Sequence, residues 1–243
     1  MIQLKDKVIF ITGASSGFGE ITATKLVAEG CKVILGARRV EKLAALAEKL
    51  GPENVAFQEM DVTKIDNVRS IVKLGLDKFG VIDGLVNNAG IMPLSMIASG
   101  RIKEWDQMID VNVKGVLYAI NAVLEHMLKR GHGKIVNVSS IAGQKVFPAS
   151  AVYSGTKFAV RAISEGLRVE TAGKIQVTNI SPGAFATELG NSINDAAIRD
   201  SLGAYEKIVQ PAEHVADAII FALKQPPSVA INELTIRPTA QEL

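Results

Sequence analysis

Two side chains with complementary proton chemistry, Tyr153 and Lys157, stand four residues apart. On a helix, residues at this spacing share one face, with their Cβ atoms about 5–6 Å apart. Because a nearby ammonium favours the phenolate, Lys157 is expected to lower the pKa of Tyr153 from about 10 toward the neutral range. The pair therefore predicts a general acid or base, although the same spacing also occurs on ordinary surface helices.

A serine that could assist this pair precedes Tyr153 by thirteen residues. Ser140 follows a β-rich run, and open α/β sheets bind their ligands at the carboxyl ends of such strands. Its hydroxyl is expected to hold a substrate carbonyl oxygen beside the phenol. The alternative is an ordinary hydroxyl that caps a turn at the end of a strand.

A glycine-rich turn, TGASSGFG at 12–19, follows the first apolar run of the chain. Its glycines Gly13, Gly17 and Gly19 have the spacing G-x-x-x-G-x-G rather than the commoner G-x-G-x-x-G. Glycines permit a tight turn and let the backbone approach a pyrophosphate, whose charge then lies at a helix N-terminus. A tight strand-to-helix turn would also use glycine, but the position between a strand and a helix favours a dinucleotide site.

The end of the second expected strand indicates which dinucleotide is bound. NAD sites usually place a carboxylate there, where it accepts the ribose 2′-hydroxyl. This chain instead has Ala37 followed by Arg38 and Arg39. Because a guanidinium fork suits a 2′-phosphate, we expect NADP(H) as the cofactor. The alternative is that both arginines only begin a solvated helix.

These residues lie within an alternation of β-rich and helical segments. Strands are expected at 7–12, 32–35, 55–60, 84–87, 134–139, 175–180 and 233–238. Helices are expected at 17–30, 40–50, 65–79, 101–130 and 150–172. Several strands are apolar on both faces, as in parallel strands that helices cover. The alternation predicts an α/β fold, a Rossmann-type doubly wound parallel sheet of about seven strands with helices on both faces.

The chain contains no linker-like stretch and no internal repeat. Residues 1–243 are therefore expected to form one domain. Its least regular stretch, about 184–210, is expected to cover a site, because irregular segments at the carboxyl edge of a sheet often do so.

Composition argues against several other classes of protein. The net charge of +2 is too small to indicate nucleic acid or an anionic membrane as a partner. No apolar run is long enough to span a membrane, and the N-terminus does not have the features of a signal peptide. A cytoplasmic location is expected.

Other kinds of active site are also poorly supported. Cys31 cannot form an internal disulfide, because it is the single cysteine of the chain. His126, His132 and His214 have no partners at metal-ligand spacing, so no metal site is expected. The chain has no G-x-S-x-G sequence, which leaves a serine hydrolase unsupported.

Taken together, the motifs resemble those of the short-chain dehydrogenase/reductase family, nearly end to end and in the same order. The matching elements are TGASSGFG at 12–19, Asp61-Val62, Asn87-Asn88-Ala89-Gly90, Asn112-Val113-Lys114-Gly115, Ser139-Ser140, Tyr153 with Lys157, and Pro182-Gly183 with Thr187. One departure concerns Ser16, because some NADP(H)-dependent members carry a basic residue at that position. The 2′-phosphate would then depend mainly on Arg38, assisted by Arg39.

The resemblance implies a role for each catalytic residue. Tyr153 would be the general acid in reduction and the general base in oxidation. Lys157 would tune its pKa and hold the nicotinamide ribose, and Ser140 would orient the substrate oxygen. Asn112 would help to hold a water that links Lys157 to solvent. The alternative is that Asn112 distorts its helix and is satisfied by backbone groups.

The same resemblance, with the arginine argument, implies a set of residues that contact NADP(H). They are Gly13, Ser15, Ser16, Gly17, Phe18, Gly19, Arg38, Arg39, Asp61, Val62, Asn88, Ala89, Gly90, Tyr153, Lys157, Pro182, Gly183 and Thr187.

The expected substrate pocket is largely apolar and lies beside Ser140. Its other candidate residues are Met92, Ile141, Phe147, Ala184, Phe185, Ala186 and Leu189, for each of which core packing is the alternative. Because this set contains no arginine to bind a carboxylate, a neutral ketone or aldehyde is expected.

The sequence therefore predicts a reversible NADPH-dependent carbonyl reductase. The alternatives within the family are a hydroxy-acid or 3-oxoacyl-thioester oxidoreductase and a steroid or sugar-alcohol dehydrogenase. Outside that class the alternatives are a non-catalytic NADP-sensing protein and a structural protein. Because the family commonly forms tetramers through its long helices and C-terminal strand, a homotetramer is expected.

Overall fold

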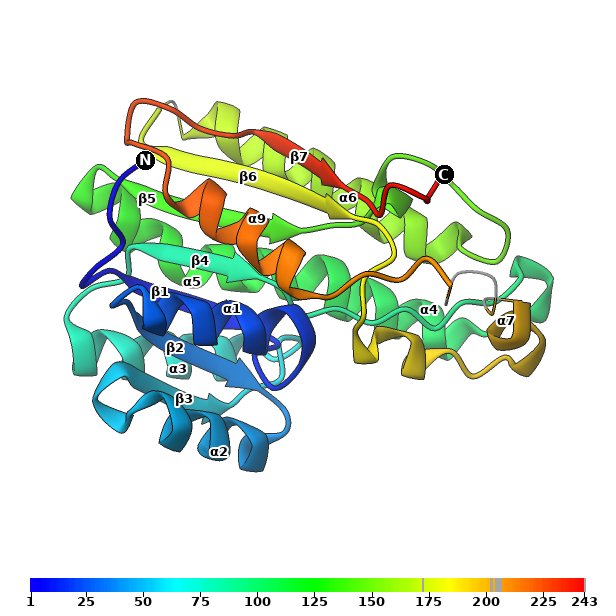
Figure 1. Cartoon of the computed structure of the whole chain (residues 1–243), viewed down its shortest axis with the longest axis horizontal. Coiled ribbons are helices and arrows are strands. Elements are labelled where there is room, and N and C mark those ends of the chain that lie inside the picture. The colour runs from blue at the N-terminus through cyan, green and yellow to red at the C-terminus, as the bar shows by residue number, and fades with distance from the viewer. Residues whose placement is uncertain (172, 202, 204–206, 243) are drawn as a thin grey trace.

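The computed structural model describes residues 1–171, 173–201, 203 and 207–242, which contain one seven-stranded parallel sheet (Figure 1). Its strands are β1 (Val8–Thr12), β2 (Lys32–Ala37), β3 (Val55–Glu59), β4 (Gly84–Asn87), β5 (Gly133–Val138), β6 (Ile175–Pro182) and β7 (Glu233–Ile236). Their order across the sheet is β3-β2-β1-β4-β5-β6-β7. The predicted fold class is confirmed.

Helices pack on both faces of this sheet. One face is covered by α1 (Gly17–Ala28), α2 (Val40–Leu50) and α9 (Glu213–Leu223). The opposite face is covered by α3 (Ile65–Phe79), α5 (Gly115–Arg130) and α6 (Ala151–Glu170). The short helices α4 (Ile102–Ile109) and α7 (Ala196–Ser201) lie beyond the carboxyl ends of the strands.

The first strand shows why the sequence folds into two packed layers. All five residues of β1 are buried. Because successive side chains point to opposite faces, Ile9 and Ile11 enter the core beneath α1 and α9, whereas Val8 and Phe10 enter the core beneath α3 and α5. A strand that is apolar at every position is therefore what a helix-covered parallel sheet requires.

The direction of winding reverses between β1 and β4. From β1 the chain moves outward to β2 and β3, then returns to place β4 on the other side of β1. In open α/β sheets a crevice forms at the carboxyl ends of the strands flanking such a reversal, and ligands bind there. The glycine turn after β1 and the Asn88 turn after β4 both lie at this point.

The expected helix at 101–130 is interrupted. The structure has α4, then a π-helical turn at Asp110–Lys114, then α5. Asn112 lies in this turn, and its side chain bonds groups outside the helix. Such single-turn π segments often mark functional sites.

Two further observations bear on the classes considered above. No described helix is long and apolar enough to cross a membrane. Cys31 is buried, its thiol donates a hydrogen bond to the Leu4 carbonyl (3.2 Å), and burial raises its pKa to about 12. Because the thiolate is the reactive form, this side chain acts as a small core residue.

Candidate active site

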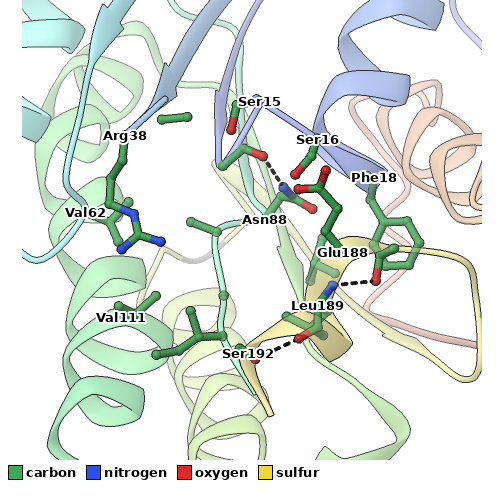
Figure 2. A pocket seen from close by; sticks show the side chains of 18 of the residues that line it. Ser15, Ser16, Phe18, Arg38, Val62, Asn88, Val111, Glu188, Leu189 and Ser192 are labelled. Atoms are coloured by element: carbon green, nitrogen blue, oxygen red, sulfur yellow. Dashed lines mark hydrogen bonds between the residues drawn. The ribbon is translucent and has the colours of Figure 1, made fainter. Parts of the chain in front are cut away.

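A cavity of about 590 Å³ opens at the carboxyl ends of the strands, at the winding reversal (Figure 2). Most of the residues predicted to bind the cofactor line it. They are Gly13, Ser15, Ser16, Gly17, Phe18, Arg38, Arg39, Asp61, Val62, Asn88, Ala89, Gly90, Tyr153, Lys157 and Thr187. Residues from α6 and from the segments that follow β1, β2, β3, β4 and β6 thus meet around one space.

The glycine turn forms one end of the cavity. Gly13 has a positive φ of 66°, and a Cβ there would lie 2.8 Å from the Ala89 Cα. Ser16 is the N-cap of α1 but makes no side-chain capping bond, so it leaves the first N–H groups of the helix available. Such a helix N-terminus attracts anions.

Gly19 does not line the cavity, yet its small size is needed. A Cβ there would lie 2.6 Å from both the Asn88 Nδ2 and the Gly13 carbonyl oxygen. The Asn88 side chain donates to the Thr12 and Gly13 carbonyls at 3.0 and 3.1 Å. The third glycine therefore lets α1 pack closely enough for Asn88 to hold the turn in place.

Substituting Gly13 with alanine is expected to destabilise the fold by about 1–3 kcal/mol, because the clash is with backbone and the φ is unfavourable. The turn would also move, and nucleotide affinity would fall. Thermal denaturation and titration with adenosine 2′,5′-bisphosphate measure both effects.

Gly166→Ala is the matched control for Gly13→Ala. Gly166 is inside helix α6, where a Cβ would meet nothing within 4 Å. Alanine there should be neutral or stabilising by up to about 1 kcal/mol. Equal melting temperatures for the two variants would contradict the proposed clash.

Helix α6 carries the proposed general acid, Tyr153, and its partner Lys157. Tyr153 and Lys157 are both buried, and the Lys157 Nζ lies 5.8 Å from the centre of the phenol ring. Lys157 donates to the Val138 carbonyl (2.9 Å) at the end of β5. Its own carbonyl accepts a bond from the Ser139 hydroxyl (3.0 Å). These contacts fix α6 against the end of β5.

Ser140 joins the phenol to the end of β5. Its hydroxyl accepts a bond from the Ala142 N–H (3.1 Å), and so it caps the short 3₁₀ turn Ile141–Gly143. The same hydroxyl is hydrogen-bonded to Tyr153. Ser140 therefore caps a turn, as its alternative role required, and also contacts the phenol. That it orients a substrate oxygen stays a prediction.

The charge state of the pair differs from the expectation. Burial raises the pKa of Tyr153 to about 12, with the Ser140 hydrogen bond opposing the rise. Burial lowers the pKa of Lys157 to about 8. The prediction that Lys157 lowers the pKa of Tyr153 is therefore wrong in this structure, because loss of hydration is the largest effect at both groups. Tyr153 is held as a neutral phenol, the form that can donate a proton.

Asn112 lies behind this pair and does not line the cavity. Its Nδ2 donates to the Ile91 carbonyl (3.0 Å) and to the Thr156 Oγ1 (3.1 Å), and its Oδ1 accepts from the Ile91 N–H (2.9 Å). A Cβ built on Gly90 would lie 3.4 Å from the Asn112 Oδ1 and 3.6 Å from the Lys157 Nζ. Asn112 is thus bonded to backbone, as its alternative role required, and also lies close to Lys157.

The two arginines after β2 have different surroundings. Arg38 is exposed, and Figure 2 shows its side chain beside Val62 at the cavity wall. Within the described part of the chain it makes no hydrogen bond or ion pair. Arg39 is half-buried and bonds Ser15 and Ser16. Arg38 is therefore the arginine that is available to an incoming phosphate.

The substrate residues predicted from sequence fall into two groups. Leu189 lines the cavity, and Met92 and Phe147 pack in the small apolar cluster that includes Tyr153. Ile141 begins the turn that Ser140 caps. Of these four residues, Met92 and Phe147 therefore lie on the phenol side of the site.

The segment after β6 corrects the rest of that prediction. Phe185 lies in the core beneath α1 and α9, with its ring 6.4 Å from that of His214. Ala184 and Ala186 pair through their backbones with Gln210. All three residues are therefore held away from the cavity, because the chain forms a bridge to Gln210 there.

Pro182 and Gly183 also lie outside the cavity lining. Pro182 ends β6 beside β7, and the N–H of Gly183, the next residue, donates to the Ile236 carbonyl (2.8 Å). The expected covering stretch 184–210 contributes Thr187, Glu188, Leu189 and Ser192 to the cavity lining, whereas its residues 202 and 204–206 lie outside the described residues. The covering role of the whole stretch stays a prediction.

Sequence reasoning missed several lining residues. They are Ala37, Met60, Ile91, Val111, Val138, Ser139, Glu188 and Ser192. Ser192 accepts a bond from the Met92 N–H (3.0 Å) and donates to the Leu189 carbonyl (2.7 Å), so it joins two walls of the cavity. No local signal could have shown this contact, because Ser192 and Met92 are one hundred residues apart in the chain.

Comparisons with known proteins agree with this geometry. The family model for short chain dehydrogenase matches residues 7–197. An uncharacterized oxidoreductase of Staphylococcus saprophyticus is 47% identical over 247 residues and covers 100% of both chains.

Solved structures give the same result. The closed form of serine dehydrogenase complexed with NADP⁺ matches with a TM-score of 0.91 and 33% identity, over 97% of this chain and 96% of that one. The alcohol dehydrogenase from the archaeon Thermococcus sibiricus complexed with 5-hydroxy-NADP matches with a TM-score of 0.88 and 30% identity, over 98% and 99% of the two chains. With its ordered motifs, its seven-stranded sheet and these matches, the chain belongs to the short-chain dehydrogenase/reductase family.

Proposed function

We propose that the protein is an NADP(H)-dependent oxidoreductase that reversibly reduces ketones or aldehydes to alcohols, with Tyr153 as the general acid. The observation that carries the proposal is the buried phenol, bonded to Ser140 and lying next to Lys157, in a cavity that the glycine turn also lines. An acid beside a dinucleotide cleft is what hydride transfer to a carbonyl requires.

The residues of the cavity fit a dinucleotide that carries a 2′-phosphate. The glycine turn presents a helix N-terminus that has no side-chain cap, which suits a pyrophosphate. At the end of β2, Arg38 is an exposed guanidinium on the cavity wall. The NADP complexes of the two structural relatives support the same assignment.

When bound, NADPH would supply the hydride to the carbonyl carbon. In our proposal, Tyr153 donates its proton to the carbonyl oxygen, and Ser140 orients that oxygen by a hydrogen bond. Lys157, held by the Val138 carbonyl, returns a proton toward the phenol and binds the nicotinamide ribose. Met92 and Phe147 exclude water from the apolar side of the site.

The direct test is a substrate panel with NADPH and with NADH, followed by absorbance at the nicotinamide band. We expect oxidation of NADPH with neutral aldehydes and ketones. The serine dehydrogenase relative favours a second candidate, oxidation of a hydroxy acid. Turnover confined to charged hydroxy acids would select that candidate.

Arg38→Asp is expected to weaken NADPH binding by at least about tenfold and to favour NADH. An acidic residue repels a 2′-phosphate and accepts a ribose 2′-hydroxyl. Dissociation constants for both nucleotides measure the effect. Lys49→Asp, an exposed substitution on helix α2 with the same charge change, is the control. An unchanged preference in Arg38→Asp would remove Arg38 from the 2′-phosphate site.

The homotetramer and the cytoplasmic location stay predictions. Exposed apolar side chains lie on the two long helices, among them Leu117 on α5 and Phe158 and Val169 on α6. A subunit interface across these helices would bury them.

A further inference from the structure

Glu188 connects the segment after β6 to the start of helix α2. Its carboxylate lies 2.7 Å from the Arg39 Nη1 and 3.3 Å from the Lys42 Nζ. Both the carboxylate and the guanidinium belong to residues that line the cavity. Figure 2 shows the Glu188 side chain turned toward Ser16 at the glycine turn.

The groups around this carboxylate are those that bind phosphates. Arg39 donates to the Ser16 Oγ (2.7 Å) and the Ser15 Oγ (3.2 Å), so a guanidinium, an ammonium and two serine hydroxyls gather at the end of β2. A guanidinium fork with hydroxyl and ammonium donors is a phosphate-binding combination. Here that anion site holds an internal carboxylate.

The carboxylate is ionised at neutral pH. Hydrogen bonding from Arg39 lowers the pKa of Glu188, burial opposes this, and further bonds from Lys42 and Ser16 lower it again. Two anions in one site repel each other strongly, so Glu188 and a 2′-phosphate cannot share Arg39 without a loss of affinity.

We propose that Glu188 competes with the 2′-phosphate of NADP(H) for Arg39 and thereby limits the affinity of the site for that cofactor. The inference rests on the proposed NADP(H) dependence and adds a specificity-determining residue to it. NADP(H) must displace the carboxylate from Arg39, whereas NAD(H), which has no 2′-phosphate, leaves the ion pair in place. Arg38, which is unpaired among the described residues, provides the first contact.

Glu188 could also have the opposite role, that of favouring NAD(H), and this role would give a different experimental result. A carboxylate at this end of a dinucleotide cleft could instead accept the ribose 2′-hydroxyl of NAD(H). Removing the Glu188 charge would then weaken NAD⁺ and leave NADP⁺ unchanged. The sign of the effect on the two nucleotides therefore separates the two roles.

The test is calorimetric titration of the full-length wild type and of Glu188→Gln with adenosine 2′,5′-bisphosphate, NADP⁺ and NAD⁺. Glutamine keeps the shape of the side chain and removes its charge. We expect adenosine 2′,5′-bisphosphate and NADP⁺ to bind about tenfold more tightly to the variant, and NAD⁺ to change less than about twofold.

Glu165→Gln is the matched control for Glu188→Gln. Glu165 is exposed and pairs with Arg168 on the surface of helix α6, so this substitution removes the same charge and one ion pair outside the cavity lining. It should leave all three affinities unchanged. A melting curve for each variant shows that the comparison is made between folded proteins.

The outcomes separate this inference from the proposed function. Unchanged or weaker binding of both 2′-phosphorylated ligands by Glu188→Gln, or equal tightening of NAD⁺, would overturn the competition while the cofactor assignment stands. Wild-type protein that binds neither adenosine 2′,5′-bisphosphate nor NADP⁺ would overturn the proposed cofactor, and the competition with it.

Discussion

Replacing Tyr153 with phenylalanine is expected to lower kcat for carbonyl reduction by about 10²–10⁴-fold while NADPH affinity changes less than about twofold. The substitution removes one oxygen from a buried ring and leaves the ring to fill the same space. The reaction would lose the group that protonates the carbonyl oxygen, while the glycine turn and Arg38 at the other end of the cavity are untouched.

Steady-state kinetics with the best substrate of the panel and a direct NADPH titration measure the two quantities. Tyr118→Phe is the control, because Tyr118 lies on helix α5 and does not line the cavity. Near-normal turnover in Tyr153→Phe would remove the phenol from the mechanism. A fall in NADPH affinity equal to the fall in kcat would show a binding role instead.

Lys157→Met should lower the activity of the protein and raise its stability. Turnover should fall by about 10²–10⁴-fold, because the variant loses the ammonium that returns protons to Tyr153. Stability should rise by about 1–3 kcal/mol at pH 7, since a shift of the pKa from 10.5 to about 8 is a cost of about 3 kcal/mol, partly offset by the lost bond to Val138.

The stability gain of Lys157→Met should depend on pH. Because burial lowers the folded-state pKa of Lys157, both states bind the proton below pH 8 and the full cost of burying the charge is present. Between about pH 8 and 10.5, the ordinary pKa of a lysine, the folded protein releases the proton first, and the cost disappears. Chemical denaturation at pH 7 and pH 10 measures this, and a variant less stable than the wild type at pH 7 would contradict it.

The loss of the Lys157 proton should also limit the activity of the wild-type enzyme at alkaline pH. The rate of reduction should fall as pH rises through about 8, because Lys157 loses the proton that it passes on, whereas the Tyr153 phenol keeps its own to about pH 12. A kcat profile that stays flat to pH 10 would show that Lys157 does not limit proton delivery.

The fold could be predicted from local sequence patterns, because the spacing of apolar residues in a segment shows which of its faces are buried. Strand β1 is apolar at every position, and only a sheet covered on both faces buries such a strand completely. In α3, the buried residues Val68, Ile71 and Val72 likewise have the spacing of one helix face. The π-helical turn at Asp110–Lys114 could not be predicted in this way, because its Asn112 bonds Ile91 and Thr156, which are distant in the chain.

The same distinction applies to the residues of the candidate site. Motifs within a few residues of one another, such as the glycine turn and the pair Tyr153 and Lys157, could be recognised from type and spacing. The segment after β6 could not: sequence placed Phe185 in the pocket, whereas the structure buries it in the core. Both positions suit an apolar ring, so composition alone does not distinguish them.

The sequence by itself determined the order of the strands along the chain, the glycine turn, the proton-transferring residues and the absence of a carboxylate after β2, because these depend on residue type and short spacing. It did not predict helices α7 and α9. The tertiary structure decided the charge states of Tyr153 and Lys157 and the pairing of Glu188 with Arg39. Burial exists only in the packed chain. It raises the pKa of Tyr153, which keeps the phenol protonated, and it lowers the pKa of Lys157, which makes its ammonium a stronger acid. Folding also brings Glu188 to Arg39 across 149 residues of sequence.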